Sequence, residues 1–190
     1  LFTAVAGLAE GSALASAVGS VAEFGLLALV ATAGVLALWC WLRERRRFWL
    51  LALAGLGVIT AYGLSEAVKL LVEEPRPCSV VDTATVLSCP GSGDWSWPSN
   101  HAVLAAAFAT ACILVVPRLA WFALPLALAI AASRVAAGVH YVHDVLSGLA
   151  LGALVVAAVV AAASPVLDRR LTGGRDGHPD SASRSQGGRA

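Results

Sequence analysis

The chain has 190 residues, of which 58% are hydrophobic and only 13% are charged, and its formal net charge is +1. Long apolar runs dominate it, which excludes a soluble globular protein and indicates an integral membrane protein. A net charge this small gives no indication of nucleic acid as a partner. We therefore expect an all-α fold, a polytopic membrane bundle of five to six transmembrane helices.

The first part of the chain contains one weak and one strong membrane segment. Residues 1–22 are rich in Ala, Gly and Ser but include Glu10, so they form either a weak first membrane helix or a helix lying at the interface. Residues 24–42 carry no charge and are close to the length of about 20 residues that a crossing needs. The basic run RERRR follows at 43–47, and the positive-inside rule places it in the cytoplasm.

The next crossing, residues 48–72, runs outward and carries Lys69 near its end. Residues 73–100 then form a long polar connection, which this topology places outside the membrane. Connections of this length usually carry function. This one contains Cys78 and Cys89, and an extracytoplasmic pair so close in sequence is expected to form a disulfide.

The apolar stretch 102–133 is too long for a single crossing. As one helix with a rise of about 1.5 Å per residue it would measure roughly 48 Å, against a hydrocarbon core of about 30 Å. Pro117 and Arg118 interrupt it near the middle, so we expect a tight cytoplasmic turn between two helices there. A last apolar run crosses inward, and the polar residues 168–190 are expected to form a disordered cytoplasmic tail.

The segment 133–144, SRVAAGVHYVHD, places an arginine, two histidines and an aspartate at the end of a long apolar run. Each charged side chain inside a bilayer costs on the order of 3 kcal/mol, so such a group indicates a functional site or a paired structural cluster. His140 and Asp144 are four residues apart, which on a helix puts them on one face, within hydrogen-bonding reach. A carboxylate that orients a histidine is half of a catalytic constellation.

The predicted topology brings further polar residues to the same side of the membrane. Arginine and lysine at this density, without matching acids, favour a polyanionic ligand, and the arginine fork suits phosphate oxygens. A serine and the backbone amides after it, at the start of a helix, would add donors at a positive dipole end. The residues that converge there are Lys69, Arg76, Ser99, Asn100, His101, Arg134, His140 and Asp144.

At these residues the chain resembles the type 2 phosphatidic acid phosphatase superfamily of membrane lipid phosphatases. The first motif of that family, Lys then six residues then Arg-Pro, begins at Lys69. The second, usually Pro-Ser-Gly-His, is Pro-Ser-Asn-His at 98–101, and the third, Ser-Arg then five residues, His, three residues and Asp, begins at Ser133. Asn100 replaces the usual glycine; because asparagine tolerates unusual backbone angles and brings its own donor, we expect activity to be retained.

The resemblance implies a role for each residue. His140, oriented by Asp144, would attack phosphorus and form a phosphohistidine, while His101 protonates the leaving oxygen and later activates water. The phosphate oxygens would be held by Lys69, Arg76, Ser99, Asn100 and Arg134. No cofactor is implied, and no metal, since the chain lacks a convincing carboxylate cluster for magnesium. We expect His143 to be structural and Glu66 to pair with the lysine of the first motif.

We therefore expect residues 23–167 to form the catalytic transmembrane domain of a lipid phosphatase whose active site faces outside the plasma membrane. By family analogy the leading substrate is undecaprenyl or decaprenyl diphosphate, hydrolysed to the monophosphate in cell-wall carrier recycling. Phosphatidylglycerol phosphate, phosphatidic acid and a phosphorylated prenyl sugar are alternatives, as is phosphate transfer to an acceptor other than water. Outside the enzymes, the residues also fit a transporter or proton relay, or a membrane protein that binds anionic lipids without turnover. They indicate no oligomeric state.

Overall fold

The computed structural model describes residues 13–81 and 85–173, and the regular structure of this part of the chain is helical, without strands. Its elements are α2 (Ala13–Arg43), α3 (Arg45–Val72), α4 (Pro77–Val80), α5 (Asn100–Val115), the 3-10 turn η1 (Pro117–Leu119), α6 (Ala120–Ala136) and α7 (Val142–Gly173). Within the described ranges, α2, α3, α7 and the continuous segment of η1 and α6 are long and apolar enough to cross a membrane, and α5 is a shorter apolar helix. The prediction of an all-α, multi-pass membrane bundle is confirmed.

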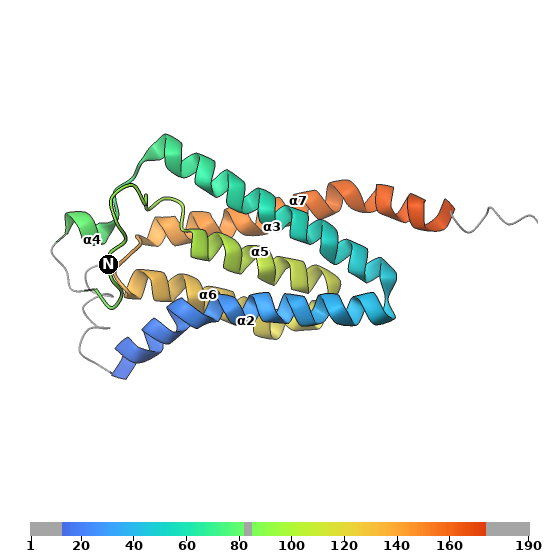
Figure 1. The fold of residues 1–190 in the computed structure, drawn as a ribbon, viewed down its shortest axis with the longest axis horizontal. Helices are drawn as coiled ribbons and strands as arrows, with labels where there is room; N and C mark the ends of the chain where they lie inside the picture. Colours follow the sequence, from blue (N-terminus) through green and yellow to red (C-terminus); the bar gives the residue numbers. More distant parts are fainter. Residues whose placement is uncertain (1–12, 82–84, 174–190) are drawn as a thin grey trace, which may run out of the picture.

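The long helices alternate in direction, so both connections that carry predicted site residues lie at one end of the bundle (Figure 1). These are the connection from α3 to α5 and the shorter one from α6 to α7. The turn predicted at Pro117 and Arg118 is η1, at the opposite end. Since α5 contacts α2, α3, α6 and α7, it is the central helix, and the site connections meet around its first turn.

Small residues let α5 and α7 approach closely. Alanines supply most of the buried face of α5, and Gly148 and Gly152 of α7 face it. A Cβ on Gly148 would stand 2.7 Å from the carbonyl oxygen of Ser99, and one on Gly152 would collide with the carbonyl of Val103. Two small residues four apart are the pattern by which membrane helices pack backbone to backbone. This packing fixes α7, which carries Asp144, against the start of α5.

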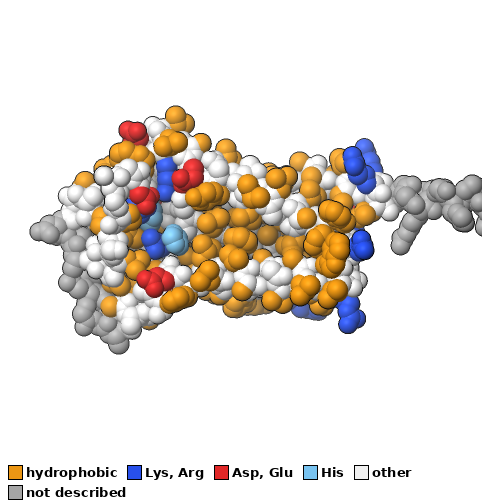
Figure 2. All heavy atoms as spheres, viewed as in Figure 1, with side chains coloured by type: hydrophobic (Ala, Val, Ile, Leu, Met, Phe, Trp, Pro, Cys, Tyr) orange, Lys and Arg blue, Asp and Glu red, His pale blue; other side chains and the backbone are white. Residues whose placement is uncertain are grey.

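The two ends of the bundle differ in charge (Figure 2). Arginines gather at the end opposite the site connections, where α2 meets α3, at η1 and near the end of α7. At the other end, Lys, Arg and His side chains are mixed with Asp and Glu. Exposed leucine, valine, isoleucine and tryptophan side chains cover the bundle between them. An apolar belt between two polar ends is the surface expected of a membrane-spanning protein.

The N-terminal helix is longer than predicted. We expected a separate segment over residues 1–22, but α2 is one continuous helix from Ala13 to Arg43, and residues 1–12 lie outside the described residues. Its first turns consist mostly of alanine, valine and serine and contain no proline. The helix can therefore continue through residue 22 without interruption. The predicted break after residue 22 is therefore absent from the described part of the chain.

The C-terminal helix also extends beyond its predicted end. We expected disorder from residue 168, yet the first residues of that tail are the last turns of α7, which ends at Gly173. Asp168 accepts two hydrogen bonds from Arg46, with Nε to Oδ1 at 2.8 Å, and this ion pair joins the end of α7 to the start of α3. The rest of the predicted tail, residues 174–190, lies outside the described residues.

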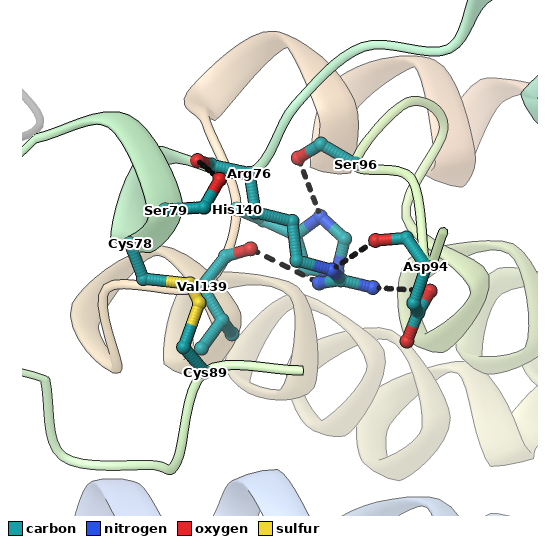
Figure 3. Close-up of a disulfide and its surroundings, with 8 residues drawn as sticks. All are labelled: Arg76, Cys78, Ser79, Cys89, Asp94, Ser96, Val139 and His140. Atoms are coloured by element: carbon teal, nitrogen blue, oxygen red, sulfur yellow. Dashed lines mark hydrogen bonds and ion pairs between the residues drawn. A yellow bond between two sulfur atoms is a disulfide. The ribbon is translucent and has the colours of Figure 1, made fainter. Parts of the chain in front are cut away.

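The connection between α3 and α5 contains the predicted disulfide, Cys78–Cys89, with its Cα atoms 5.8 Å apart (Figure 3). Cys78 belongs to α4, which directly follows Arg76, and Cys89 precedes the segment that reaches Asp94. The bond therefore joins two stretches that each carry a charged residue of the site described below.

Replacing both Cys78 and Cys89 by Ser should lower the free energy of unfolding by about 3 kcal/mol, because the open chain gains loop entropy when it unfolds. The expected measurement is a lower Tm of the variant in detergent, matched by the wild-type chain under reductant. Labelling of either cysteine by a thiol reagent in the folded, unreduced protein would contradict the bond.

Candidate active site

His140 lies in the short connection between α6 and α7 and is almost completely buried. Its Nε2 is 2.9 Å from Nη1 of Arg76, and its Nδ1 is 3.2 Å from Oδ2 of Asp144 (Figure 3 shows the arginine side). A guanidinium has only donors, so Nε2 accepts the bond from Arg76 and Nδ1 carries the proton that it donates to Asp144. The imidazole thus keeps a lone pair on Nε2, as a nucleophile requires.

Burial keeps this imidazole neutral. Removal from water lowers the pKa of His140 to about 4, and the positive charges of Arg76 and Arg134 act in the same direction. The hydrogen bond to Asp144 and the charge of that carboxylate act the other way without cancelling the shift. At neutral pH the unprotonated, nucleophilic form therefore dominates.

Asp144 lies in the first turn of α7 and is fully buried. Besides the proton from His140, its Oδ2 accepts hydrogen bonds from the Ser96 hydroxyl and, at 2.9 Å, from the backbone N–H of Tyr141. Its backbone oxygen accepts the N–H of Ser99 at 3.1 Å, which links α7 to the start of α5. Several donors on one carboxylate restrict its position, and with it the ring that it orients.

Arg76 links the two site connections. It precedes α4, is buried, and donates from Nη1 to the carbonyl of Val139 at 3.1 Å as well as to His140. Its Nε and Nη2 donate to the backbone and side-chain oxygens of Asp94, each at 2.9 Å (Figure 3). Nζ of Lys69 lies 3.5 Å from the same Asp94 carboxylate. Both cations of the first motif therefore meet at Asp94.

The Asp94 carboxylate is the anion that Arg76 and Lys69 contact in this structure. Burial alone would raise the pKa of this carboxyl, but the hydrogen bond and charge of Arg76, together with Lys69, hold the pKa below its ordinary value. The side chain is half exposed and follows the glycine-containing sequence PGSG at 90–93. A phosphate bound by the same two cations would compete with Asp94 for their donors.

Ser99, His101 and Arg134 come from α5 and α6. The Ser99 hydroxyl and Nε of Arg134 are buried and have no hydrogen-bond partner among the described residues. Buried polar groups in this state are uncommon, so both are suited to an incoming acceptor oxygen. His101 is half-buried in the first turn of α5, and its imidazole feels the charges of Arg134 and His140. The site thus contains a second imidazole within electrostatic range of the first.

The side chain of Asn100 points toward α3. Its Oδ1 accepts from the Ser65 hydroxyl at 2.6 Å, and its Nδ2 donates to Oε1 of Glu66, also at 2.6 Å. Glu66 lies 3.7 Å from Nζ of Lys69, which is the ion pair predicted from the sequence. A phosphate contact from Asn100 would therefore come from its backbone N–H, at the start of α5, since the side chain is already engaged.

The set of residues predicted from the sequence lacked Asp94 and Ser96. Both lie in the stretch DWSW directly before the second motif, and this proximity is the only sequence signal that they carry. Asp94 contacts Arg76, and Ser96 contacts Asp144 and is itself fully buried. A polar residue in an irregular connection has no periodicity, so the fold alone reveals what it contacts.

Glu74, His143 and Asp144 offer side-chain atoms within 4.8 Å of one another, a separation at which they could hold a metal ion. In the structure they pair directly: Nε2 of His143 is 2.9 Å from Glu74 and 3.0 Å from Oδ1 of Asp144. Because Asp144 also holds His140, an ion there would act on the candidate nucleophile. Chelation is therefore part of the functional test below.

Comparison with known proteins gives a family and two named relatives. The model of the PAP2 superfamily matches residues 50–166. The chain is 38% identical over 120 residues to decaprenylphosphoryl-5-phosphoribose phosphatase of Mycobacterium tuberculosis, a match that covers 62% of this chain and 63% of that protein. It is 33% identical over 95 residues to an undecaprenyl-diphosphatase of Sulfolobus acidocaldarius, covering 50% of this chain and 46% of that protein. The chain thus aligns with less than two thirds of either relative.

Two solved structures share the fold. LpxE from Aquifex aeolicus gives a TM-score of 0.66 at 21% identity, with 84% of this chain and 92% of that chain covered. A PAP2-type phosphatidylglycerolphosphate phosphatase from Bacillus subtilis gives a TM-score of 0.64 at 24% identity, with 87% of this chain and 85% of that chain covered. At these identities the likeness concerns the fold alone.

Proposed function

Because the chain belongs to the PAP2 superfamily, we propose that it removes a phosphate from a polyprenyl-linked membrane lipid through a phosphohistidine formed on His140. The observation that carries the proposal is the pair of contacts on this ring. Asp144 holds the proton-bearing Nδ1, while Nε2 keeps its lone pair beside the guanidinium of Arg76. Phosphoryl transfer depends mostly on positioning and on stabilising charge, and this arrangement supplies both.

The proposed reaction consists of two displacements at phosphorus. In the first, the Nε2 lone pair of His140 forms the bond to phosphorus as the bond to the lipid oxygen breaks, and protonated His101 gives its proton to that oxygen. In the second, neutral His101 takes a proton from water, whose oxygen bonds to phosphorus as the phosphorus–nitrogen bond breaks. The products are the dephosphorylated lipid and inorganic phosphate.

The cations hold the phosphate oxygens during both steps. Arg76 and Lys69 would exchange the Asp94 carboxylate for phosphate, while Nε of Arg134 and the Ser99 hydroxyl would gain the acceptor that they lack in the protein. Charge-assisted hydrogen bonds of this kind stabilise the transition state because they are already in place when charge redistributes.

Two lipids are the main candidates for the substrate. The relative named undecaprenyl-diphosphatase supports a polyprenyl diphosphate, hydrolysed to the monophosphate for re-use in cell-wall synthesis. The relative named decaprenylphosphoryl-5-phosphoribose phosphatase, which is more similar over a longer stretch, supports a phosphorylated prenyl sugar. Both carry an isoprenoid chain, which would lie against the exposed apolar side chains of the bundle.

We also propose that the site faces the outside of the plasma membrane, with residues 23–167 as the catalytic domain. The arginines at the far end of the bundle support this orientation, because positively charged connections are retained in the cytoplasm. The disulfide in the site connection supports it as well, since such bonds persist in oxidising compartments.

The test is phosphate release by the purified chain in detergent. The panel contains a polyprenyl diphosphate, a polyprenyl monophosphate, a prenylphosphoryl phosphoribose, phosphatidic acid and phosphatidylglycerol phosphate. Release from a polyprenyl lipid, lost when His140 is replaced, is the expected result. Absence of release from every lipid, combined with phosphate or proton movement into proteoliposomes, would favour a transporter instead.

Excess chelator should leave the rate of phosphate release unchanged within about twofold, because side-chain cations and no metal stabilise the charge in this mechanism. The measurement is the initial rate with and without EDTA after dialysis against chelator. A rate that falls and returns with added magnesium or another divalent ion would instead assign Glu74, His143 and Asp144 a catalytic metal.

Ser96→Ala should lower kcat by about tenfold or more with little change in KM, because a hydrogen bond to the carboxylate that orients His140 is lost. Ser96→Thr, which keeps a hydroxyl, should restore most of the activity. If Ser96 only supports the fold, the Ala variant will show a lower Tm but an unchanged kcat per folded molecule.

A further inference from the structure

A polar cavity of about 280 Å³ lies beside the phosphate-binding cations, between the outer end of α3, the loop at 93–95 and the start of α5. The residues of its wall that bear on its chemistry are Tyr62, Glu66, Lys69, Asp94, Trp95 and Asn100. None of the mechanistic steps above uses Tyr62, Glu66 or Trp95. Because Lys69 and Asp94 also belong to the proposed phosphate site, the cavity adjoins that site and extends beyond it.

The position of the cavity makes it accessible to the chemical group that is attached to a bound phosphate. Lys69 belongs both to the cavity wall and to the cation pair of the first motif, and Asp94 bridges it to Arg76. Arg76 in turn contacts Nε2 of His140. A substrate whose phosphate sits on these cations therefore brings its next chemical group to the mouth of the cavity.

The chemistry of the wall favours hydroxyl groups. The Glu66 carboxylate is half exposed, and Asn100 holds its Oε1 at 2.6 Å, so it is fixed as an acceptor. Asn100 is fixed in turn by the Ser65 hydroxyl, which keeps this polar pair rigid. The phenol of Tyr62 can donate or accept, and the indole of Trp95 offers an apolar face. Oriented acceptors beside an aromatic face are suited to a ring that carries several hydroxyls.

The same wall disfavours the other main candidate. A diphosphate would bring a second phosphate close to the carboxylates of Glu66 and Asp94, whose two negative charges exceed the one positive charge of Lys69 in the same wall. An isoprenoid chain could contact Tyr62, Leu70 and Trp95, but it would leave the carboxylates, the amide and the lysine of the same wall without water or another partner. A neutral polyhydroxylated group avoids both penalties.

We propose that this cavity binds the hydroxyls of a sugar ring attached directly to the reacting phosphate, so that the substrate is a phosphorylated sugar lipid. The inference rests on the proposed phosphatase function and names its substrate class. Glu66 and Tyr62 are the specificity-determining side chains, and Asn100 positions Glu66.

The experiment compares three probes on the full chain in detergent. They are farnesylphosphoryl-5-phosphoribose, its counterpart whose ribose lacks both ring hydroxyls, and farnesyl diphosphate. The first two differ only in the groups that the cavity would bind. The wild-type kcat/KM should favour the hydroxylated probe by at least about tenfold, because a site built for hydroxyls leaves its acceptors unpaired with the other.

Variants of single side chains test whether the cavity causes the preference for the hydroxylated probe. Tyr62→Phe should reduce it severalfold while leaving turnover of farnesyl diphosphate unchanged, which also shows that the variant is folded. Glu66→Gln provides a second change in the cavity. Tyr141→Phe is the control, because it also removes a tyrosine hydroxyl but lies outside the cavity, where the Tyr141 ring stacks on His143. It should leave the preference for the hydroxylated probe at the wild-type value.

The possible outcomes distinguish a failure of the sugar-binding site from a failure of the proposed phosphatase function. Equal turnover of the hydroxylated and hydroxyl-free probes would overturn the sugar site and leave the phosphatase intact. A preference that survives both Tyr62→Phe and Glu66→Gln would overturn its assignment to this cavity. Failure to release phosphate from all three probes would remove the phosphatase function, and the inference with it.

Discussion

Replacing His140 by Ala should lower phosphate release by roughly four orders of magnitude or more, because the reaction loses its nucleophile and cannot form the covalent intermediate. The remaining cations would still bind substrate, so KM should change far less than kcat. The measurement is the initial rate of phosphate release, with substrate binding followed separately by competition. Substantial turnover in His140→Ala would exclude a phosphohistidine at this position.

His143→Ala is the matched control for this variant. The two histidines lie three residues apart in the same segment, but the side chain of His143 is 58% exposed and pairs with Glu74. Its contact with Asp144 is to Oδ1, whereas His140 is held by Oδ2. We therefore expect His143→Ala to retain activity within about tenfold, since it removes one neighbour of the orienting carboxylate and no reacting atom.

The helices and two contacts of the candidate site could be predicted from the sequence because each has a local signal. Apolar runs interrupted by charges and prolines predict spans and turns, and the η1 turn lies where the proline and arginine predicted it. The spacing of His140 and Asp144 predicts a contact that the structure contains, at 3.2 Å. The spacing of the two cysteines in a polar connection likewise predicts their disulfide.

The contacts around these residues could not be predicted because they join segments far apart in the chain. Arg76 and His140 are 64 residues apart, and only the packing of α3 and α7 around α5 brings them together. Asp94 and Ser96 lie in an irregular connection, where neither periodicity nor spacing indicates a partner. The direction of the Asn100 side chain depends on Ser65 and Glu66 of a neighbouring helix, so the consequence of replacing the usual glycine was also hidden.

The direction of the Asn100 side chain changes the interpretation of this residue, which replaces the usual glycine of the second motif. Asn100 was expected to be tolerated and to help hold the phosphate oxygens, whereas its side chain joins α5 to α3 through two short hydrogen bonds. Since Glu66 is one of the partners, the departure from the family pattern occurs where the polar cavity is built. The residue that departs from the family motif thus lines the cavity for which we proposed a sugar ligand.

His101→Gln should lower kcat/KM for a prenylphosphoryl phosphoribose by about 10²–10⁴-fold, because the leaving sugar oxygen would depart without a proton. The loss should be smaller with farnesyl diphosphate, whose leaving group is a phosphate and needs little protonation. The measurement is kcat/KM for both substrates in both proteins, because this ratio reports the first displacement, whereas kcat also contains the water attack that both substrates share. Equal losses of kcat/KM on the two substrates would contradict a role for His101 as the general acid.

The same variant should trap the intermediate. With p-nitrophenyl phosphate, the leaving group departs without a proton, so His140 is still phosphorylated, while water attack is slowed because the general base is missing. Radiolabelled phosphate should therefore accumulate on the His101→Gln protein and survive a basic quench, in which phosphohistidine is stable. The double variant with His140→Ala should carry no label. Label that persists in the double variant would place the covalent phosphate on another residue, whereas label confined to His140 assigns the nucleophile and the acid–base residue in one experiment.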